Sequence, residues 1–125
     1  MTKEIQKDDM FITIVAFEKF HGTKPYKLGS ILKLVKEPDN HYDTEAIAIE
    51  MRYVGKAGYI ANSTHTVVKG TMSAGRLYDK ITDDKDFAEV KFIASHMIIA
   101  KVVDEERLEE LKKDIENDVH YLLKH

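Results

Sequence analysis

The sequence predicts a mainly β protein with helices, an α+β fold built on a small barrel of about six strands. Six short apolar or alternating segments are separated by turn-forming residues, a pattern typical of a barrel rather than a parallel sheet. The length of 125 residues is enough for one domain with a hydrophobic core. Residues 104–125 instead have the apolar periodicity of a helix.

The strands are recognised by alternating apolar and polar side chains and by their content of β-branched and aromatic residues. In the first strand, Phe17 is expected on the same face as Thr13 and on the face opposite Ile12, because side chains alternate along a strand. The expected strands are residues 10–17, 28–35, 45–53, 56–60, 89–94 and 97–103.

Two short helices are expected between the fourth and fifth strands. Asn62 or Ser63 could cap a helix that ends at Gly70, and Ser73 could cap another that continues through Tyr78. Both assignments rest on the preference of Asn and Ser for the N-cap position of a helix. There the side chain accepts a hydrogen bond from a backbone N–H of the first turn that has no partner within the helix.

The segment GTMSAGR combines small residues, hydroxyl groups and Arg76. Such a loop can expose backbone N–H groups to a phosphate, and the alternative is a loop that only packs. The segment lacks the G-x-x-x-x-G-K-[ST] spacing of a nucleotide-binding loop, so such a loop is not predicted.

The C-terminal segment is predicted to form one amphipathic helix about 30 Å long. Acidic residues 104–106 begin it and Lys124 lies near its end, which suits the helix dipole. Its apolar stripe would pack on the barrel or on a second copy in a homodimer. The stripe consists of Leu108, Leu111, Ile115, Val119 and Leu122.

The stretch EPDNHYDTEAIAIE, residues 37–50, places polar turn residues directly before an apolar strand. Pro38 and Asn40 favour a turn, so Tyr42 and Asp43 are expected at the mouth of that strand. An aromatic ring beside an amide and a carboxylate on a rigid strand is suited to binding a small polar group. The alternative is a tight turn whose Asp and Asn side chains satisfy local N–H groups.

Three segments together resemble the HIRAN domain family: a Gly and a Tyr before a strand, an N-x-Y-D-x-x-A-I core, and a G-Y-I strand. The resemblance covers roughly residues 10–103. It implies an OB-like or SH3-like barrel over residues 1–103, followed by the helical segment 104–125. The matching residues are Gly22, Tyr26, Asn40, Tyr42, Asp43, Ala46, Ile47, Gly58 and Tyr59.

The resemblance also implies a function: recognition of the 3′-hydroxyl end of single-stranded DNA by a small free-standing protein in DNA repair or processing. Lys24 and Tyr26 would face the DNA backbone and the terminal base, and Asn40, Tyr42 and Asp43 would form the end pocket. The full set of expected nucleic-acid-binding residues is Lys24, Tyr26, Asn40, Tyr42, Asp43, Tyr59 and Arg76.

The chemistry of Asp43 supports this expectation independently. A carboxylate repels the DNA backbone but accepts a hydrogen bond from a 3′-hydroxyl, so it would distinguish a free end from a 3′-phosphate. Tyr26 and Tyr42 could each stack on a base, which adds affinity without sequence preference.

The distribution of charge is compatible with nucleic acid although the net charge is −3. Residues 19–36 carry five Lys and no acidic residue, and residues 51–80 carry five basic residues against Asp79 alone. The acidic C-terminal segment suggests the alternative of a protein-interaction or regulatory module.

Several other functions are not predicted. The six His show no metal-ligand spacing, and no nucleophile with a placed base is present, so we expect neither a metal, a cofactor nor an enzyme. The chain has no Cys, no signal peptide and no apolar run of membrane-spanning length, so we expect a cytoplasmic protein without a membrane partner.

Overall fold

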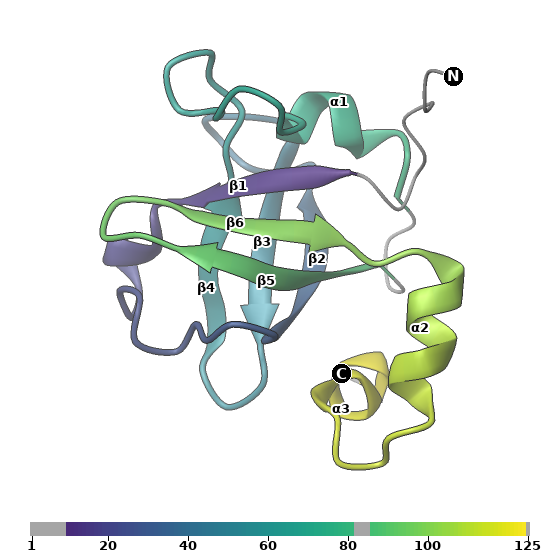
Figure 1. Cartoon of the computed structure of the whole chain (residues 1–125). Helices are drawn as coiled ribbons and strands as arrows, with labels where there is room; N and C mark the ends of the chain where they lie inside the picture. Colours follow the sequence, from purple (N-terminus) through teal and green to yellow (C-terminus); the bar gives the residue numbers. More distant parts are fainter. Residues whose placement is uncertain (1–9, 82–85, 125) are drawn as a thin grey trace, which may run out of the picture.

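The computed structural model describes residues 10–81 and 86–124, and its centre is a closed barrel of six antiparallel strands (Figure 1). The strands follow one another around the barrel in the order β1, β4, β3, β2, β5 and β6, and β6 pairs with β1. The predicted small barrel of about six strands is therefore confirmed. The strands are β1 (Phe11–Val15), β2 (Ile31–Glu37), β3 (Ala46–Met51), β4 (Gly55–Ile60), β5 (Phe87–Ile93) and β6 (Ile98–Val102).

The interior of the barrel is filled by apolar side chains from all six strands. Alternation along each strand sends every second side chain inward, and the short β-branched and Leu side chains fill the narrow space. The fully buried members include Ile12, Ile14, Leu32, Leu34, Ile47, Ile49 and Ile98.

Phe17 lies in the same core as Ile12, not on the opposite face as the alternation predicts. The strand ends at Val15 and does not continue through Ala16.

 The backbone of Ala16 is left-handed, with φ 61°, and it turns the chain out of β1 into the short 3-10 helix η2 (Phe17–Lys19). The turn brings the Phe17 ring back over the end of the barrel, so this prediction of the sequence is wrong.

Within the described residues, the long connection from β4 to β5 contains one helix, α1 (Ala74–Tyr78), at one end of the barrel (Figure 1). It begins as predicted, because the Ser73 hydroxyl accepts a hydrogen bond from the Arg76 N–H at 3.3 Å. Two of its side chains, Ala74 and Leu77, are buried in the barrel core. The helix therefore closes this end of the barrel.

The other helix predicted in this connection, ending at Gly70, is not present. Residues 63–67 form turns and bends, and two backbone N–H groups of the segment that follows bond to β1. The Val68 N–H donates to the Thr13 hydroxyl at 3.2 Å, and the Met72 N–H donates to the Phe11 carbonyl at 2.7 Å. These bonds hold the segment as a loop against the first strand.

The predicted single C-terminal helix is wrong, because the structure has two, α2 (Glu105–Lys112) and α3 (Asp118–Lys124). The break arises from side chains that bond local backbone groups in competition with the helix. Asp114 accepts from the Glu116 N–H at 3.0 Å, and Asn117 accepts from the Val119 N–H at 2.9 Å. No helix in the described part of the chain is long and apolar enough to cross a membrane.

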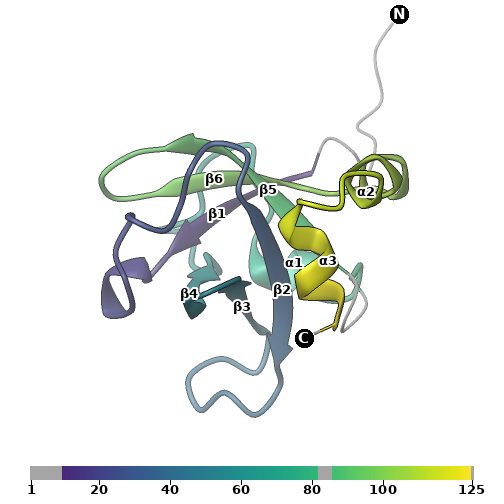
Figure 2. The same ribbon diagram turned by 90° about the horizontal axis from the view of Figure 1, so that it is seen from below.

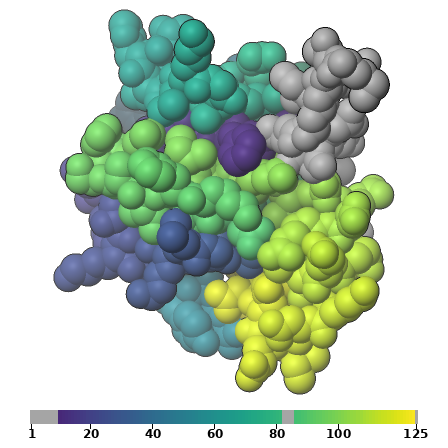
Figure 3. All heavy atoms as spheres, viewed as in Figure 1, coloured from purple at the N-terminus to yellow at the C-terminus, as the bar shows by residue number. Residues whose placement is uncertain are grey.

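The break folds α3 back along β2, as the view from below shows (Figure 2). A second apolar cluster forms there, outside the barrel, so the C-terminal stripe packs on its own chain except at Ile115, which is exposed. In the space-filling view both helices lie against the lower right of the barrel (Figure 3). The buried members of this cluster are Ile31, Phe87, Leu111, Val119 and Leu122.

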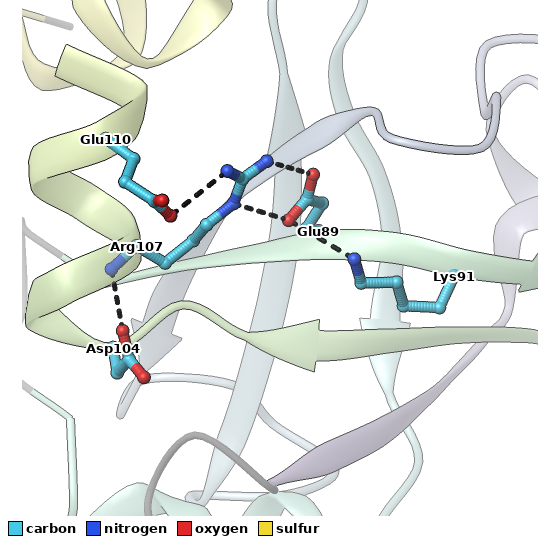
Figure 4. A network of polar contacts seen from close by, with 5 residues as sticks. All are labelled: Glu89, Lys91, Asp104, Arg107 and Glu110. Carbon is cyan, nitrogen blue, oxygen red and sulfur yellow. Dashed lines mark hydrogen bonds and ion pairs between the residues drawn. The ribbon is translucent and has the colours of Figure 1, made fainter. Parts of the chain in front are cut away.

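An ion pair fixes α2 to β5 (Figure 4). Arg107 donates two hydrogen bonds to the Glu89 carboxylate, at 3.1 and 2.9 Å, and Glu89 is only 8% exposed. Burial alone would raise the pKa of Glu89, but the hydrogen bond from Arg107 and the charge of Lys91 lower it. The pair therefore remains charged at neutral pH and sets the position of the helix.

Candidate nucleic-acid interface

A groove of about 780 Å³ lies near α1, because its lining residue Asn62 accepts a hydrogen bond from the Gly75 N–H of that helix. Its walls come from the ends of β1 and β4, from η2, from the loop between β2 and β3, and from the segment after β4. Three segments that are distant in sequence, residues 15–19, 40–46 and 59–66, therefore meet at one surface. The lining residues are Val15, Ala16, Lys19, Asn40, Tyr42, Asp43, Ala46, Tyr59, Ile60, Asn62, Ser63 and Thr66.

The groove brings together four of the seven residues that the sequence marks for nucleic-acid binding. They are Asn40, Tyr42, Asp43 and Tyr59. Lys24 is exposed in the turns before β2, and Arg76 is exposed on α1, but neither lines the groove. Contacts of these two side chains with nucleic acid stay predictions.

Tyr26 has a different place, inside the barrel core with 3% of its surface exposed. Its hydroxyl donates to the Ala57 carbonyl at 2.7 Å, and its ring packs edge-on against Phe17. Burial raises the pKa of the Tyr26 phenol, so it remains a neutral donor. This position contradicts the prediction that Tyr26 stacks on a base or faces the DNA backbone, because neither face of the ring is open.

Asn40 shapes the loop between β2 and β3. Its side-chain carbonyl accepts hydrogen bonds from the N–H groups of Tyr42 and Asp43, at 2.9 and 3.1 Å. Its side-chain NH₂ donates to Glu37 at 3.1 Å. The alternative of a turn that satisfies local N–H groups thus describes Asn40 well, and the turn presents the next two residues to the groove.

Tyr42 stands at the rim of the groove with 99% of its surface exposed. Burying so large an aromatic ring against a ligand would be favourable, and both of its faces are open to a planar partner. Because the Tyr42 N–H is held by Asn40, the ring projects from a fixed backbone.

Asp43 is held at both carboxylate oxygens. Its Oδ1 accepts from the Glu45 N–H at 2.9 Å, and its Oδ2 accepts from the Asn62 side-chain NH₂ at 2.7 Å. A carboxylate has about four lone-pair positions, and these bonds use two of them. The group can therefore still accept a hydrogen bond from a donor in the groove.

Tyr59 forms one wall, and a charged pair orients its ring. The Tyr59 hydroxyl donates to Glu37 at 2.7 Å, and Lys56 bonds both the hydroxyl and the Glu37 carboxylate. Burial and the hydrogen bond that Tyr59 donates to Glu37 raise the pKa of Tyr59. The hydrogen bond that Lys56 donates to Glu37 raises the pKa of Lys56. The Phe20 ring packs on Tyr59 with 6.1 Å between the ring centroids. The wall is therefore rigid.

Four polar residues line the groove that the sequence does not mark for nucleic-acid binding: Lys19, Asn62, Ser63 and Thr66. Lys19 is the one cationic side chain among the described residues that line it. It belongs to the basic segment 19–36, but nothing in that segment distinguishes it from the other Lys. The sequence suggests that Asn62 or Ser63 caps a helix, because it does not show that the residues after β4 form a loop against β1.

Two solved structures share the fold. A crystal structure of a protein from Lactobacillus plantarum matches with a TM-score of 0.54 and 17% identity, over 74% of this chain and 88% of the other. The crystal structure of the HIRAN domain of human HLTF matches with a TM-score of 0.52 and 17% identity, over 92% of this chain and 85% of the other. At this identity the likeness shows the fold alone.

The amino-acid sequence identifies the family. A search of curated proteins found no significant match. The family model of the HIRAN domain matches residues 7–83, which is more than half of the chain and includes most of the groove-lining segments. The chain therefore belongs to the HIRAN domain family, whose members are nucleic-acid-binding modules rather than catalytic ones.

Proposed function

We propose that the groove binds the 3′-hydroxyl end of single-stranded DNA. The observation that carries the proposal is Asp43, a carboxylate fixed by two hydrogen bonds with acceptor positions left over. A terminal hydroxyl is a donor that fills such a position, whereas a terminal phosphate would place like charges together.

The other groove residues suit a nucleotide without reading its base. The exposed Tyr42 ring offers a stacking surface, and every base has a face that can stack. Lys19 supplies a positive charge beside the groove for a backbone phosphate. We infer binding with little sequence preference, as a protein of DNA repair or processing needs. The absence of Cys agrees with work in the reducing cytoplasm.

Fluorescence anisotropy with one short oligonucleotide, carrying either a 3′-hydroxyl or a 3′-phosphate, tests the proposal. We expect tighter binding of the hydroxyl end, although the phosphate end carries more charge for Lys19 to attract. In Asp43→Asn the preference should disappear, because an amide no longer repels the phosphate and its NH₂ can donate to it. Equal affinity of the wild-type protein for both ends would contradict the proposal.

A 5′-phosphate on the same oligonucleotide is the matched control for charge. It adds the same group at the end that the groove does not bind, so it should leave the affinity nearly unchanged. A similar loss of affinity from either phosphate would indicate general repulsion instead of end recognition.

A further inference from the structure

Asn62 connects the groove to α1 through its side-chain amide. The Gly75 N–H, in the first turn of α1, donates to the Asn62 Oδ1 at 2.7 Å. The Asn62 Nδ2 in turn donates to the Asp43 Oδ2 at 2.7 Å. One side chain thus joins three segments: the loop before β3, the segment after β4, and α1.

The direction of the Asn62 amide follows from its two partners. A backbone N–H can only donate, so the carbonyl oxygen of Asn62 must face Gly75. The NH₂ group then necessarily faces Asp43, which as a carboxylate can only accept. No other amide orientation satisfies both contacts.

The approach of α1 to Asn62 is close. A Cβ atom added to Gly75 would lie 3.1 Å from the Asn62 Oδ1 and 2.7 Å from the Glu45 Oε1. The absence of a side chain at Gly75 therefore lets the start of α1 approach Asn62 closely.

We propose that Asn62 is a positioning residue that sets the selectivity of the groove by orienting the Asp43 carboxylate. The inference rests on the proposed function. Without the Asn62 donor, only the Glu45 N–H would hold the carboxylate, which could then rotate about its terminal torsion. A carboxylate that rotates forms a weaker bond to the hydroxyl end, whereas the affinity for a phosphate end does not depend on that bond.

Two variants separate the functions of the amide. Asn62→Ala removes both contacts. Asn62→Asp keeps an acceptor for Gly75 but loses the donor to Asp43. We expect each to bind the hydroxyl-ended oligonucleotide about fivefold more weakly relative to the phosphate-ended one than the wild-type protein does.

Thr64→Ala is the matched control for a substitution in this segment. Thr64 is exposed two residues after Asn62 and does not line the groove. Its replacement should leave the end preference unchanged.

The measurement is the ratio of the two dissociation constants, with thermal unfolding of each variant as a check on folding. An unchanged ratio in a folded Asn62 variant would overturn the inference, as would equal weakening of both oligonucleotides in Asn62→Ala. If neither variant folded, Asn62 would be a residue of the fold alone, and the inference would also fall. A wild-type protein without any end preference would instead reject the proposed function, before a variant is measured.

Discussion

The Tyr26 hydroxyl donates a 2.7 Å hydrogen bond to the carbonyl of Ala57, the residue that the pairing of β3 with β4 skips. The next residue, Gly58, has no room for a side chain, since a Cβ there would lie 2.9 Å from the same hydroxyl. Tyr26, the bulge in β4 and Gly58 therefore form one packing unit. These members of the family pattern build the barrel, whereas Asn40, Tyr42 and Asp43 build the groove.

Tyr26→Phe should lower the free energy of unfolding by about 1–3 kcal/mol, because the buried Ala57 carbonyl loses this donor. Urea unfolding followed by circular dichroism measures the change. Binding of single-stranded DNA by the folded variant should equal that of the wild-type protein. A loss of DNA affinity with unchanged stability would mean that the Tyr26 hydroxyl reaches the ligand after all.

Tyr42→Ala should weaken DNA binding by about 1–3 kcal/mol through the loss of stacking. The ring is fully exposed in the free protein, so the free energy of unfolding should change by less than about 0.5 kcal/mol. Tyr42→Phe is the matched control and should keep most of the affinity, because the ring remains. Anisotropy titrations compare the three proteins, and equal affinity of Tyr42→Ala and wild type would remove the stacking contact from the proposal.

Lys19→Gln should reduce the salt dependence of DNA binding. Each phosphate contact to a single strand contributes about 0.7 to the slope of log affinity against log salt, so the slope should fall by about that amount. Lys112→Gln, on the exposed side of α2, is the control and should leave the slope unchanged. The same slope in both variants would place the backbone contact elsewhere.

The charged pair beside Tyr59 predicts a dependence of stability on pH. Burial alone would raise the pKa of Glu37, but hydrogen bonds from Lys56, Tyr59 and Asn40 lower it. Glu37 therefore stabilises the fold fully above the pKa of about 4.3 of an unfolded Glu, and this stabilisation is lost as the pH falls through the lower folded value. Urea unfolding at a series of pH values should show a shallower acid decline in Glu37→Gln. Parallel curves for the two proteins would contradict this assignment.

The break between α2 and α3 leaves some apolar residues of the stripe buried and Ile115 exposed. Leu122→Ala should lower the free energy of unfolding by about 2–5 kcal/mol, since Leu122 is buried against the barrel. Ile115→Ala should change it by less than about 0.5 kcal/mol, because Ile115 is 86% exposed at the break. Chemical unfolding of both variants measures the difference, and equal losses would support the single helix that the sequence suggests.

The sequence predicts the barrel well because the signals that specify it are local. The alternation along each strand and the turn residues between strands depend only on neighbours in the chain. The structure has strands at the positions that these signals indicate. The cap of Ser73 on α1 is equally local and is confirmed. The sequence also anticipates the loop of Asn40, Tyr42 and Asp43, whose hydrogen bonds join residues two or three positions apart.

The parts that sequence reasoning missed depend on contacts between distant segments. The sequence does not show that Tyr26 is buried, because its hydroxyl donates a hydrogen bond to the carbonyl of Ala57, 31 residues later. Asn62 looks like a cap until Asp43 and Gly75 are found on either side of it. In the C-terminal segment, the apolar period favours one helix, and only the side-chain bonds of Asp114 and Asn117 show why it breaks.

The position of β5 and β6 in the barrel has a consequence for the limits of the domain. These two strands lie between β2 and β1 and complete the ring, yet both follow residue 83, where the family match ends. A fragment cut at that residue would leave β1 and β2 as two open edges, each with unpaired backbone donors and acceptors that invite other chains. The smallest unit with a closed barrel therefore extends through β6, well past the segment by which the family is recognised.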